Sequence, residues 1–264
     1  MTDHTDLLRI FAGSEKHHQL IVFDKTPEGE IQKDEKGKVK TRVVTNQGVT
    51  SAPQPPTPEL AKAHLDGTGD GLGVFPLRED DSVAWGSFDI DDYALTPEVI
   101  DKRIQERELP LIAVRSKSGG THVFAFAQGW VDPELMREAL DGYRTQLQVP
   151  SSVIDRVPDQ TEAHGGTRCG TGISMPYYGA RSTEGTHRCA VWNGEDLSLD
   201  AFVAKVDELA VTENTLQQAA RGPAFDDGGW VTDGPPCLQQ IVAEGGISEN
   251  GQLNDGRRKV LTQY

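Results

Sequence analysis

The stretch WGSFDIDDYALTPEVID, residues 85–101, contains the end of an apolar strand and the start of a helix. Asp89 and Asp91 are one residue apart where the apolar run ends. Because side chains alternate along a strand, both carboxylates are predicted to point to the same face, where they repel each other. Mg²⁺ and Mn²⁺ prefer such hard oxygen ligands. The pair therefore indicates either a divalent-metal site or an acidic cluster that caps the next helix.

Strand-like and helix-like patterns alternate on both sides of this stretch. Strands are predicted at residues 20–23, 83–91, 109–116, 121–127 and 151–157. Helices are predicted at residues 59–65, 97–108 and 133–147, where a proline follows a capping residue or opens the periodic segment. Residues 24–48 are predicted to form a projecting β-hairpin. This alternation indicates a mixed α/β or α+β domain.

The domain organisation is predicted from a change in composition near residue 208. We expect one α/β domain over residues 1–207, a linker over residues 208–227 and a helical segment over residues 228–264. The last residue falls inside a periodic segment, so we also expect the protein to continue in a longer chain.

Composition excludes several classes of protein. The chain has 264 residues and a formal net charge of −15, which argues against broad, non-specific binding to nucleic acid. A local basic groove or bound divalent metals would still allow a nucleic-acid partner. No apolar stretch approaches the roughly 20 residues of a membrane span, and the first residues, MTDHTDLLRIFAG, lack the basic-then-apolar pattern of a secretory signal. Three cysteines are typical of a reducing cytoplasm rather than of a disulfide framework.

A second motif, RSKSGGTHVFAF, residues 115–126, places a glycine pair between two strands. Backbone amides in such a turn can form an anion-binding nest. The donors around it are Arg115, Lys117, Ser118 and His122, and His122 begins the second strand. The motif indicates a phosphate site, or else an ordinary hairpin turn with solvated basic residues.

A third motif, SSVIDRVPDQ, residues 151–160, carries Asp155 after a strand-compatible run. Alone, such an acid is typical of a surface charge or a turn. If a sheet brings Asp155 beside Asp89 and Asp91, three carboxylates converge next to the glycine turn. That combination, in this order, is much less expected by accident than any of its parts.

The order of FDIDD (88–92), SKSGGTHVF (116–124) and VIDRVPDQ (153–160) resembles the three motifs of the archaeo-eukaryotic primase superfamily. Two further stretches, AHLDGTGDGLGVFPLREDDSVAWGSFDID (63–91) and GISMPYYGARS (172–182), are similar to segments of primase-polymerases from phages, plasmids and related mobile elements. The resemblance covers roughly residues 55–205.

The resemblance implies an RRM-like sheet joined to a second α/β unit, with the active site in the cleft between them. It implies that two divalent ions, Mg²⁺ or Mn²⁺, are held by Asp89, Asp91 and Asp155. Asp159 is a poor substitute for Asp155, because it lies beyond a proline. The implied nucleotide-binding residues are Arg115, Lys117, Ser118, Gly119, Gly120, His122 and Arg181.

The implied reaction is template-directed nucleotidyl transfer, which makes or extends primers in DNA replication. The implied partners are single-stranded DNA template, primer and dNTP or NTP. The resemblance also implies that a replicative helicase can be part of the same longer chain. The implied location is the cytoplasm of a bacterium or of a phage-infected cell. Two alternatives remain open: a metal-dependent phosphoesterase or nuclease, and a catalytically inactive nucleotide- or DNA-binding module. The motifs do not separate priming from extension, or dNTP from NTP.

The tail, the aromatic residues and the cysteines give further predictions. GPPCLQQ (234–240) and NDGRRKVL (254–261) resemble the start of the helical region that follows the catalytic domain in such proteins, although a plain helical pair fits equally well. The aromatic residues Phe88, Phe124 and Phe126 are predicted to be core rather than RNA-binding. Cys237 is predicted to be an apolar filler. Zinc is disfavoured, because its candidate ligands lack a paired CxxC pattern: His164, Cys169, His187 and Cys189.

Overall fold

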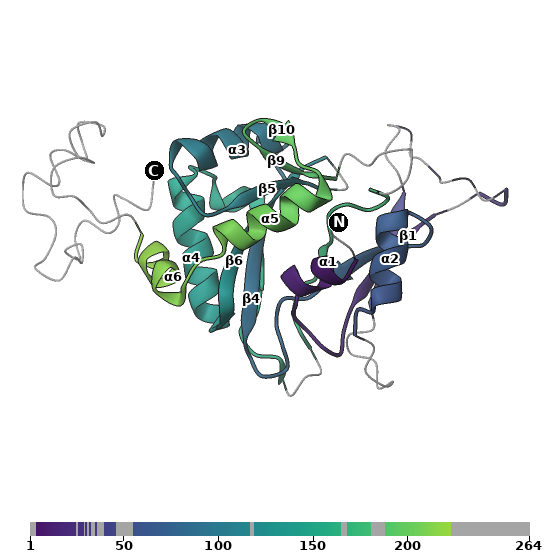
Figure 1. Cartoon of the computed structure of the whole chain (residues 1–264), viewed down its shortest axis with the longest axis horizontal. Coiled ribbons are helices and arrows are strands. Elements are labelled where there is room, and N and C mark those ends of the chain that lie inside the picture. Colours follow the sequence, from purple (N-terminus) through teal and green to yellow (C-terminus); the bar gives the residue numbers. More distant parts are fainter. Residues whose placement is uncertain are drawn as a thin grey trace, which may run out of the picture. The chain divides into compact units, whose positions relative to one another are not determined.

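A computed structural model describes residues 4–24, 26–28, 30, 32, 35, 40–45, 55–116, 119–164, 168–180 and 188–222. All of these residues belong to one compact unit, residues 1–222 (Figure 1). The elements in chain order are α1 (His4–Ile10), β1 (Gln19–Phe23), β2 (Thr41–Thr45), α2 (Pro58–Asp66), β3 (Gly71–Val74), β4 (Val83–Ile90), α3 (Pro97–Glu106), β5 (Ile112–Arg115), β6 (Thr121–Val131), α4 (Pro133–Gln146), a 3₁₀ turn (Ser151–Val153), β7 (Ile154–Val157), β8 (Ile173–Ser174), β9 (Ala190–Trp192), β10 (Glu195–Asp196), α5 (Leu199–Leu209) and α6 (Glu213–Ala220).

The larger sheet has six strands in the order β10-β9-β5-β6-β4-β7, and its paired strands are antiparallel. Its centre follows the chain order β4-α3-β5-β6-α4-β7. This is the βαββαβ arrangement, with the four core strands ordered β5-β6-β4-β7, as in an RRM. The mixed α/β class and the RRM-like sheet predicted from the sequence are therefore confirmed.

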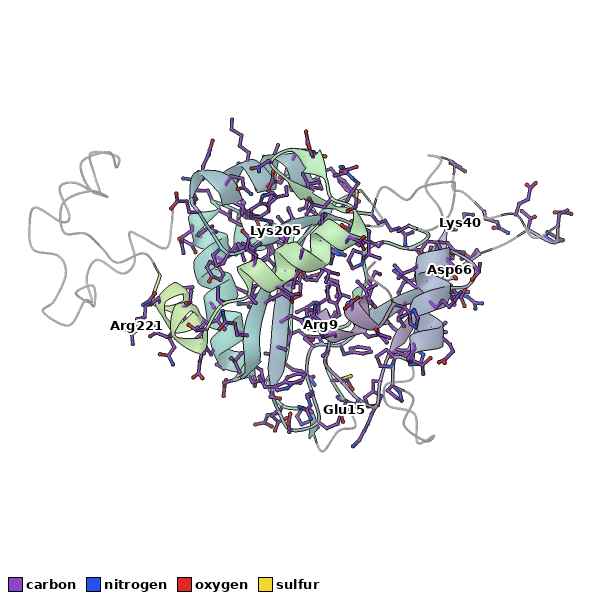
Figure 2. The ribbon with its side chains drawn as sticks, viewed as in Figure 1. Arg9, Glu15, Lys40, Asp66, Lys205 and Arg221 are labelled. Carbon is purple, nitrogen blue, oxygen red and sulfur yellow. The ribbon has the colours of Figure 1, made fainter. Side chains whose placement is uncertain are left out.

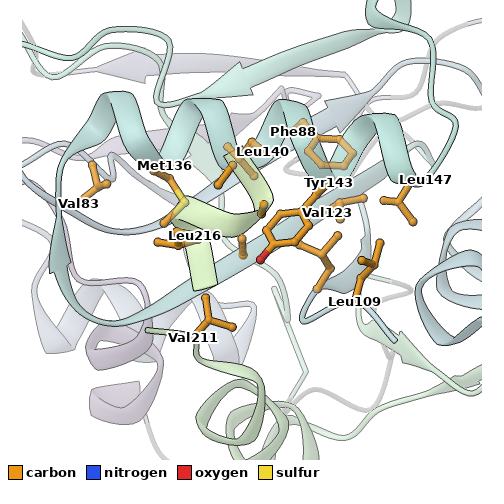
Figure 3. Packing of buried hydrophobic residues seen from close by; sticks show 14 of the residues in the cluster. Val83, Phe88, Leu109, Val123, Met136, Leu140, Tyr143, Leu147, Val211 and Leu216 are labelled. Carbon is orange, nitrogen blue, oxygen red and sulfur yellow. The ribbon is translucent and has the colours of Figure 1, made fainter. Parts of the chain in front are cut away.

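Helices α3 and α4 cover one face of this sheet. Each begins at a capping side chain: Thr96 Oγ1, the predicted cap of α3, accepts from the Val99 N–H, and Asp132 Oδ1, just before the predicted start of α4, accepts from the Glu134 N–H at 2.7 Å. In β4, Phe88 and Ile90 point toward these helices and are fully buried. Figure 3 shows the resulting cluster, in which Met136, Leu140 and Tyr143 of α4 pack against the sheet. Alternation along β4 thus assigns Asp89 to the opposite face.

That opposite face packs against the second sheet, which has four strands in the order β2-β1-β3-β8. Leu72 and Val74 of β3 share one apolar cluster with Trp85, Phe124 and the helix α5. Helix α1 lies in the same cluster and is tied to α5 by an ion pair between Arg9 and Asp207, at 2.8 Å; Figure 2 labels Arg9. The predicted second α/β unit is therefore present, and an apolar core joins it to the RRM-like sheet.

The three aromatic residues assigned to the core are buried as predicted. Phe88 and Phe124 are 0% exposed and Phe126 is 4% exposed. None of the three therefore offers a ring to a nucleic acid. Among the helices of the described residues, none has the length and apolar character needed to cross a membrane.

Residues 208–227 were expected to form a linker, and for residues 213–220 this expectation is wrong. These residues form α6, which begins at the cap Thr212 and buries Leu216 and Ala219 against α4. A Cβ at Gly142 of α4 would lie only 1.9 Å from the Ala219 carbonyl oxygen, so the close approach of the two helices depends on this glycine. The segment TENTLQQAAR is polar overall, so its short apolar stripe of Leu216 and Ala219 was not recognised in the sequence. Residues 223–264, including the predicted helical segment, lie outside the described residues.

The predicted hairpin is partly described. Strands β1 and β2 pair antiparallel, with Phe23 opposite Thr41. The arms of the described hairpin are therefore residues 19–23 and 41–45, and the first arm begins earlier than the predicted residue 24.

Candidate active site

Three side chains from three separate motifs lie in one row across the larger sheet. Asp89 of β4 pairs directly with His122 of β6 on one side and with Asp155 of β7 on the other. Directly opposite residues of antiparallel strands point to the same face, with Cβ atoms about 5 Å apart. The row therefore brings two carboxylates and an imidazole together on the face that looks toward the four-stranded sheet.

His122 is held in place within this row. Its Nε2 lies 3.5 Å from Asp89 Oδ1, and its ring packs edge-on against Phe124 with centroids 6.1 Å apart. The His122 side chain is 9% exposed, whereas that of Asp89 is 35% exposed. The imidazole is thus fixed by packing, while the neighbouring carboxylate stays open to solvent and to a ligand.

The three acids predicted to bind metal are all accessible to solvent. Asp155 is exposed, and Asp91 follows the end of β4 and is also exposed. No group of three His, Cys, Asp or Glu side chains in the described part of the chain is gathered closely enough to hold an ion by itself. Mg²⁺ usually keeps several waters and binds through one or two carboxylates plus substrate phosphates. The opposed carboxylates of Asp89 and Asp155 suit that mode of binding.

The glycine turn beside the row requires its glycines. Gly119 has a φ of +89°, a backbone conformation that other residues rarely adopt. A Cβ at Gly120 would lie 2.9 Å from the Ile90 carbonyl oxygen of β4. The turn is closed by the Ser116 N–H, which donates to the Gly120 carbonyl at 2.9 Å. The predicted donors Lys117 and Ser118 lie outside the described residues.

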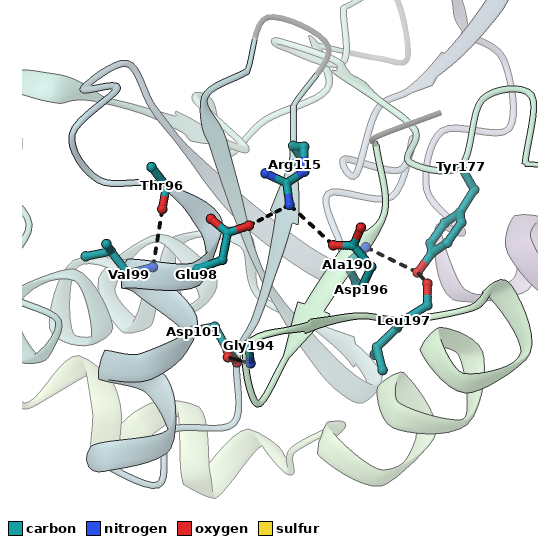
Figure 4. Close-up of polar contacts among 10 residues, drawn as sticks. All are labelled: Thr96, Glu98, Val99, Asp101, Arg115, Tyr177, Ala190, Gly194, Asp196 and Leu197. Carbon is teal, nitrogen blue, oxygen red and sulfur yellow. Dashed lines mark hydrogen bonds and ion pairs between the residues drawn. The ribbon is translucent and has the colours of Figure 1, made fainter. Parts of the chain in front are cut away.

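Arg115 does not join this site, contrary to expectation. It follows Val114 by one residue in β5, and Val114 is the residue that pairs with His122, so the Arg115 side chain points to the other face. There its Nη2 lies 2.6 Å from Glu98 Oε1 and 3.3 Å from Asp196 Oδ1 (Figure 4). Burial opposes the Arg115 charge, but the hydrogen bonds to these carboxylates raise its pKa. Arg115 therefore joins α3 to β10 and has no open charge for a nucleotide.

The remaining predicted residues are distributed as follows. Arg181 and His187 lie outside the described residues, as does Cys237. Cys169 and Cys189 are buried, and burial raises the pKa of Cys169 to about 12 and that of Cys189 to about 11. Both thiols are thus neutral at physiological pH, and no metal-binding group that includes His164 occurs among the described side chains.

A polar pocket of about 360 Å³ adjoins Asp155 at the open edge of the sheet. Arg156 in its wall is paired with Asp141, and Arg137 with Glu134 at 3.4 Å. Asp159, the rejected third acid, is also in the wall and accepts from the Thr171 N–H at 2.6 Å. The pocket is lined by Arg137, Ile154, Asp155, Arg156, Asp159 and Thr171.

His64, within the stretch 63–91, has a structural role that the sequence did not indicate. Its Nδ1 accepts from the Leu72 N–H at 2.9 Å, and its Nε2 lies 2.8 Å from the Pro176 carbonyl oxygen. The ring thus joins α2 to β3 and to the segment after β8. Burial, together with the nearby charge of Arg188, lowers the pKa of His64 from 6.5 to about 4.

This pKa shift predicts a loss of stability in mild acid. Below pH 6.5 the unfolded chain binds a proton at His64 that the folded chain excludes, so the free energy of unfolding falls as the pH drops toward 4. Between pH 7 and pH 5, the wild type is expected to lose about 2 kcal/mol through His64. Urea titrations of the wild type and of His64→Gln at both pH values measure this contribution, because the other titrating groups cancel in the comparison. Equal pH dependence in the two proteins would contradict it.

A comparison with known protein families matches more than half of this chain to one family. Residues 24–188 match the family model described as "TOTE conflict system, Archaeo-Eukaryotic Primase domain". No curated protein matches the chain. Among solved structures, similarity is found to the catalytic domain of primase RepB′ in complex with initiator DNA, with 13% identity over 83% of this chain and 95% of that chain and a TM-score of 0.33. The polymerase domain of Mycobacterium tuberculosis ligase D in complex with DNA has 15% identity over 88% and 91% of the two chains, with a TM-score of 0.34. Structural similarities at this level carry no information about function.

Proposed function

Since this chain belongs to the archaeo-eukaryotic primase domain family of TOTE conflict systems, and thus to the primase-type nucleotidyltransferases, we propose that it is a DNA primase-polymerase. The proposed reaction is template-directed transfer of a nucleotidyl group from a dNTP or NTP to a 3′-hydroxyl. The observation that carries the proposal is the row of Asp155, Asp89 and His122, because three distant motifs of a single family meet there.

The proposed displacement needs little covalent chemistry from the protein. The 3′-hydroxyl oxygen of the primer forms a bond to the α-phosphorus, the bond to the bridging oxygen of the β-phosphate breaks, and pyrophosphate leaves as the hydroxyl proton passes to solvent. Asp89 and Asp155, with Asp91 at the end of β4, would hold Mg²⁺ or Mn²⁺. When bound, these ions favour ionisation of the attacking hydroxyl and offset charge on the leaving oxygens.

The other residues of the site would position the substrate. His122, fixed between Asp89 and Phe124, presents Nε2 to a phosphate oxygen without having to reorganise during the reaction. The turn of Ser116, Gly119 and Gly120 lets a phosphate approach the backbone next to His122. Positioning and electrostatics of this kind account for most of the rate enhancement in phosphoryl transfer.

The proposal requires nucleic acid to approach an acidic protein. With a formal net charge of −15, the chain would repel a DNA backbone over much of its surface. Divalent ions at Asp89 and Asp155 would lower that repulsion where the primer end must lie. We therefore propose that affinity for single-stranded template depends on divalent metal. A helicase on the same longer chain remains a prediction from the resemblance.

The test is incubation of the full chain with single-stranded DNA template, labelled dNTPs or NTPs, and Mg²⁺ or Mn²⁺, with and without a primer. Template-dependent incorporation with release of pyrophosphate is the expected result. Products formed without a primer would establish priming, and products formed only with a primer would establish extension alone. Parallel reactions with each nucleotide class would determine the sugar preference.

Two other outcomes would overturn the proposal. Shortening of the template or primer without incorporation would identify a metal-dependent nuclease that uses the same acids on water. Absence of both activities, together with no Mn²⁺ binding by paramagnetic relaxation, would identify a catalytically inactive binding module.

A further inference from the structure

Arg188, which sequence reasoning did not single out, lies close to the row of Asp155, Asp89 and His122. It precedes β9 by two residues, and Ala190 of β9 pairs with Val114, which in turn pairs with His122. The adjacent Cys189 carbonyl accepts from the Arg115 N–H at 3.0 Å. Arg188 therefore lies beside the glycine turn, two strands from His122, which corresponds to a backbone separation on the order of 10 Å.

The Arg188 side chain points to the face of the sheet that carries His122. Its Cζ lies 5.2 Å from the ring centroid of Tyr178 and 5.7 Å from that of Phe23. Phe23 ends β1 of the four-stranded sheet, and Tyr178 follows β8 of the same sheet. Because the four-stranded sheet packs on the face that bears Asp89 and His122, the guanidinium lies on that side as well.

Among the described side chains, the Arg188 guanidinium contacts the aromatic rings of Phe23 and Tyr178. In the part of the chain that the structure describes, Arg188 forms no ion pair or hydrogen bond through its guanidinium. Other partly buried arginines have such partners: Arg103 donates to the Leu147 carbonyl at 2.9 Å, and Arg144 donates to the Val149 carbonyl at 2.7 Å. Burial lowers the pKa of Arg188. Burying a cation costs free energy unless an anion or hydrogen-bond acceptors pair with it.

We propose that the Arg188 guanidinium binds the β- and γ-phosphates of the incoming nucleoside triphosphate. This assignment rests on the proposed function and adds a residue to it. Stacking on aromatic faces leaves the edges of the planar guanidinium open, and those edges carry five N–H donors suited to bidentate phosphate binding. The position also suits a triphosphate, whose α-phosphate would lie near Asp89 and His122 while its tail follows the glycine turn toward Arg188.

The assignment also explains the double ion pair of Arg115. Arg115 is the cation of the motif 115–126 whose side chain the structure describes, and it is neutralised on the far face of the sheet. Arg188 reaches the same turn from the neighbouring strand and on the correct face. The proposed phosphate-binding residue Arg188 is thus remote in sequence from the turn that it faces.

The test compares affinities for nucleoside tri-, di- and monophosphates. Equilibrium binding of ATP, dATP and the corresponding di- and monophosphates is measured with Ca²⁺, which replaces Mg²⁺ to suppress turnover, on the full chain. Arg188→Gln is expected to weaken triphosphate binding about 10- to 100-fold, as for loss of a hydrogen bond to a charged group, and to change monophosphate binding less than about threefold. In extension assays, KM for the nucleotide should rise more than kcat falls.

Two further variants separate this role from a structural one. Arg188→Lys keeps the positive charge but loses the planar guanidinium with its paired N–H donors, so we expect it to bind triphosphate with intermediate affinity. This variant also tests the assignment if Arg188→Gln folds poorly. Arg42→Gln removes an exposed arginine of β2 in the same chain and should leave all affinities unchanged.

Several outcomes would overturn the assignment. Unchanged triphosphate affinity in a folded Arg188→Gln protein would do so, as would an equal loss for tri-, di- and monophosphates, which would show that Arg188 only supports the fold. Loss of affinity for single-stranded DNA alone would place the bound phosphate on the template. A wild type that binds no triphosphate would overturn the proposed function and this assignment together.

Discussion

Replacing Asp89 with asparagine is expected to reduce nucleotide incorporation about 1,000-fold or more while the protein stays folded. Asp89 is the central member of the row, between His122 and Asp155, so both divalent ions would depend on it. Metal ions contribute several kcal/mol of transition-state stabilisation in such reactions, and each 1.4 kcal/mol corresponds to about a factor of ten in rate. Single-turnover extension of a primed template measures the loss.

The same variant should have the opposite effect on the metal-free protein. Asp89 and Asp155 are like charges directly opposite each other in adjacent strands, an arrangement that destabilises a sheet. Asp89→Asn is therefore expected to leave Tm in EDTA unchanged or slightly higher than in the wild type. Mn²⁺ should raise the Tm of the wild type and should have a much smaller effect on the variant. This readout does not depend on activity.

Asp207→Asn provides the matched control. It makes the same chemical change on α5, where Asp207 pairs with Arg9 at the surface, outside the row. Incorporation and the Mn²⁺-dependent rise in Tm should both persist in this control. Near-normal incorporation by Asp89→Asn, or a full Mn²⁺ response in that variant, would remove the proposed metal site.

Trp85→Ala is expected to lower the free energy of unfolding by about 3–5 kcal/mol, as for the loss of a buried tryptophan from a core. Trp85 is 0% exposed and belongs to the cluster through which the two sheets contact each other. Its indole packs edge-on against Phe11, with centroids 5.4 Å apart, and its Nε1 donates to the Ala12 carbonyl at 2.9 Å. Both neighbours follow α1, so the substitution weakens the junction between the sheets and α1. Urea unfolding measures the effect.

Two comparisons test whether the effect depends on this position. Trp85→Phe keeps a ring but loses the donor to Ala12, so its cost should be closer to about 1–2 kcal/mol. Trp130→Ala removes a tryptophan that is 43% exposed and stacked under Arg78, and should cost about 1 kcal/mol or less. A Trp85→Ala protein within 1 kcal/mol of wild type would show that the two sheets do not depend on a common core.

Much of the local structure could be predicted from the sequence because its causes are local. Thr96 and Asp132 cap the helices that follow them, and apolar alternation gives β4 and β6 at the expected places. Helix α6 was missed because only Leu216 and Ala219 carry its apolar face, and α4 must be present before that face has a partner. A short amphipathic helix depends on tertiary packing more than on its own composition.

The site was predicted in part, and the errors have a common physical cause. Asp89, His122 and Asp155 were correctly expected to meet, because the order of three motifs could be compared with a family. Arg115 was assigned to the wrong face, because a one-residue shift along a strand reverses the direction of a side chain. The sequence also gave no sign that Glu98 and Asp196 would neutralise Arg115.

By itself, the sequence determined the caps, the alternation of the strands, the glycine turn and the identity of the acids. Only the tertiary structure decided which strand pairs with which, and hence that Asp155 lies opposite Asp89 and that Arg188 lies over the rings of Phe23 and Tyr178 beside the turn. The physical reason is that dihedral preferences and caps act over a few residues, whereas strand register is fixed by the burial of two whole faces. Residues far apart along the chain therefore acquire their partners only when both sheets have formed.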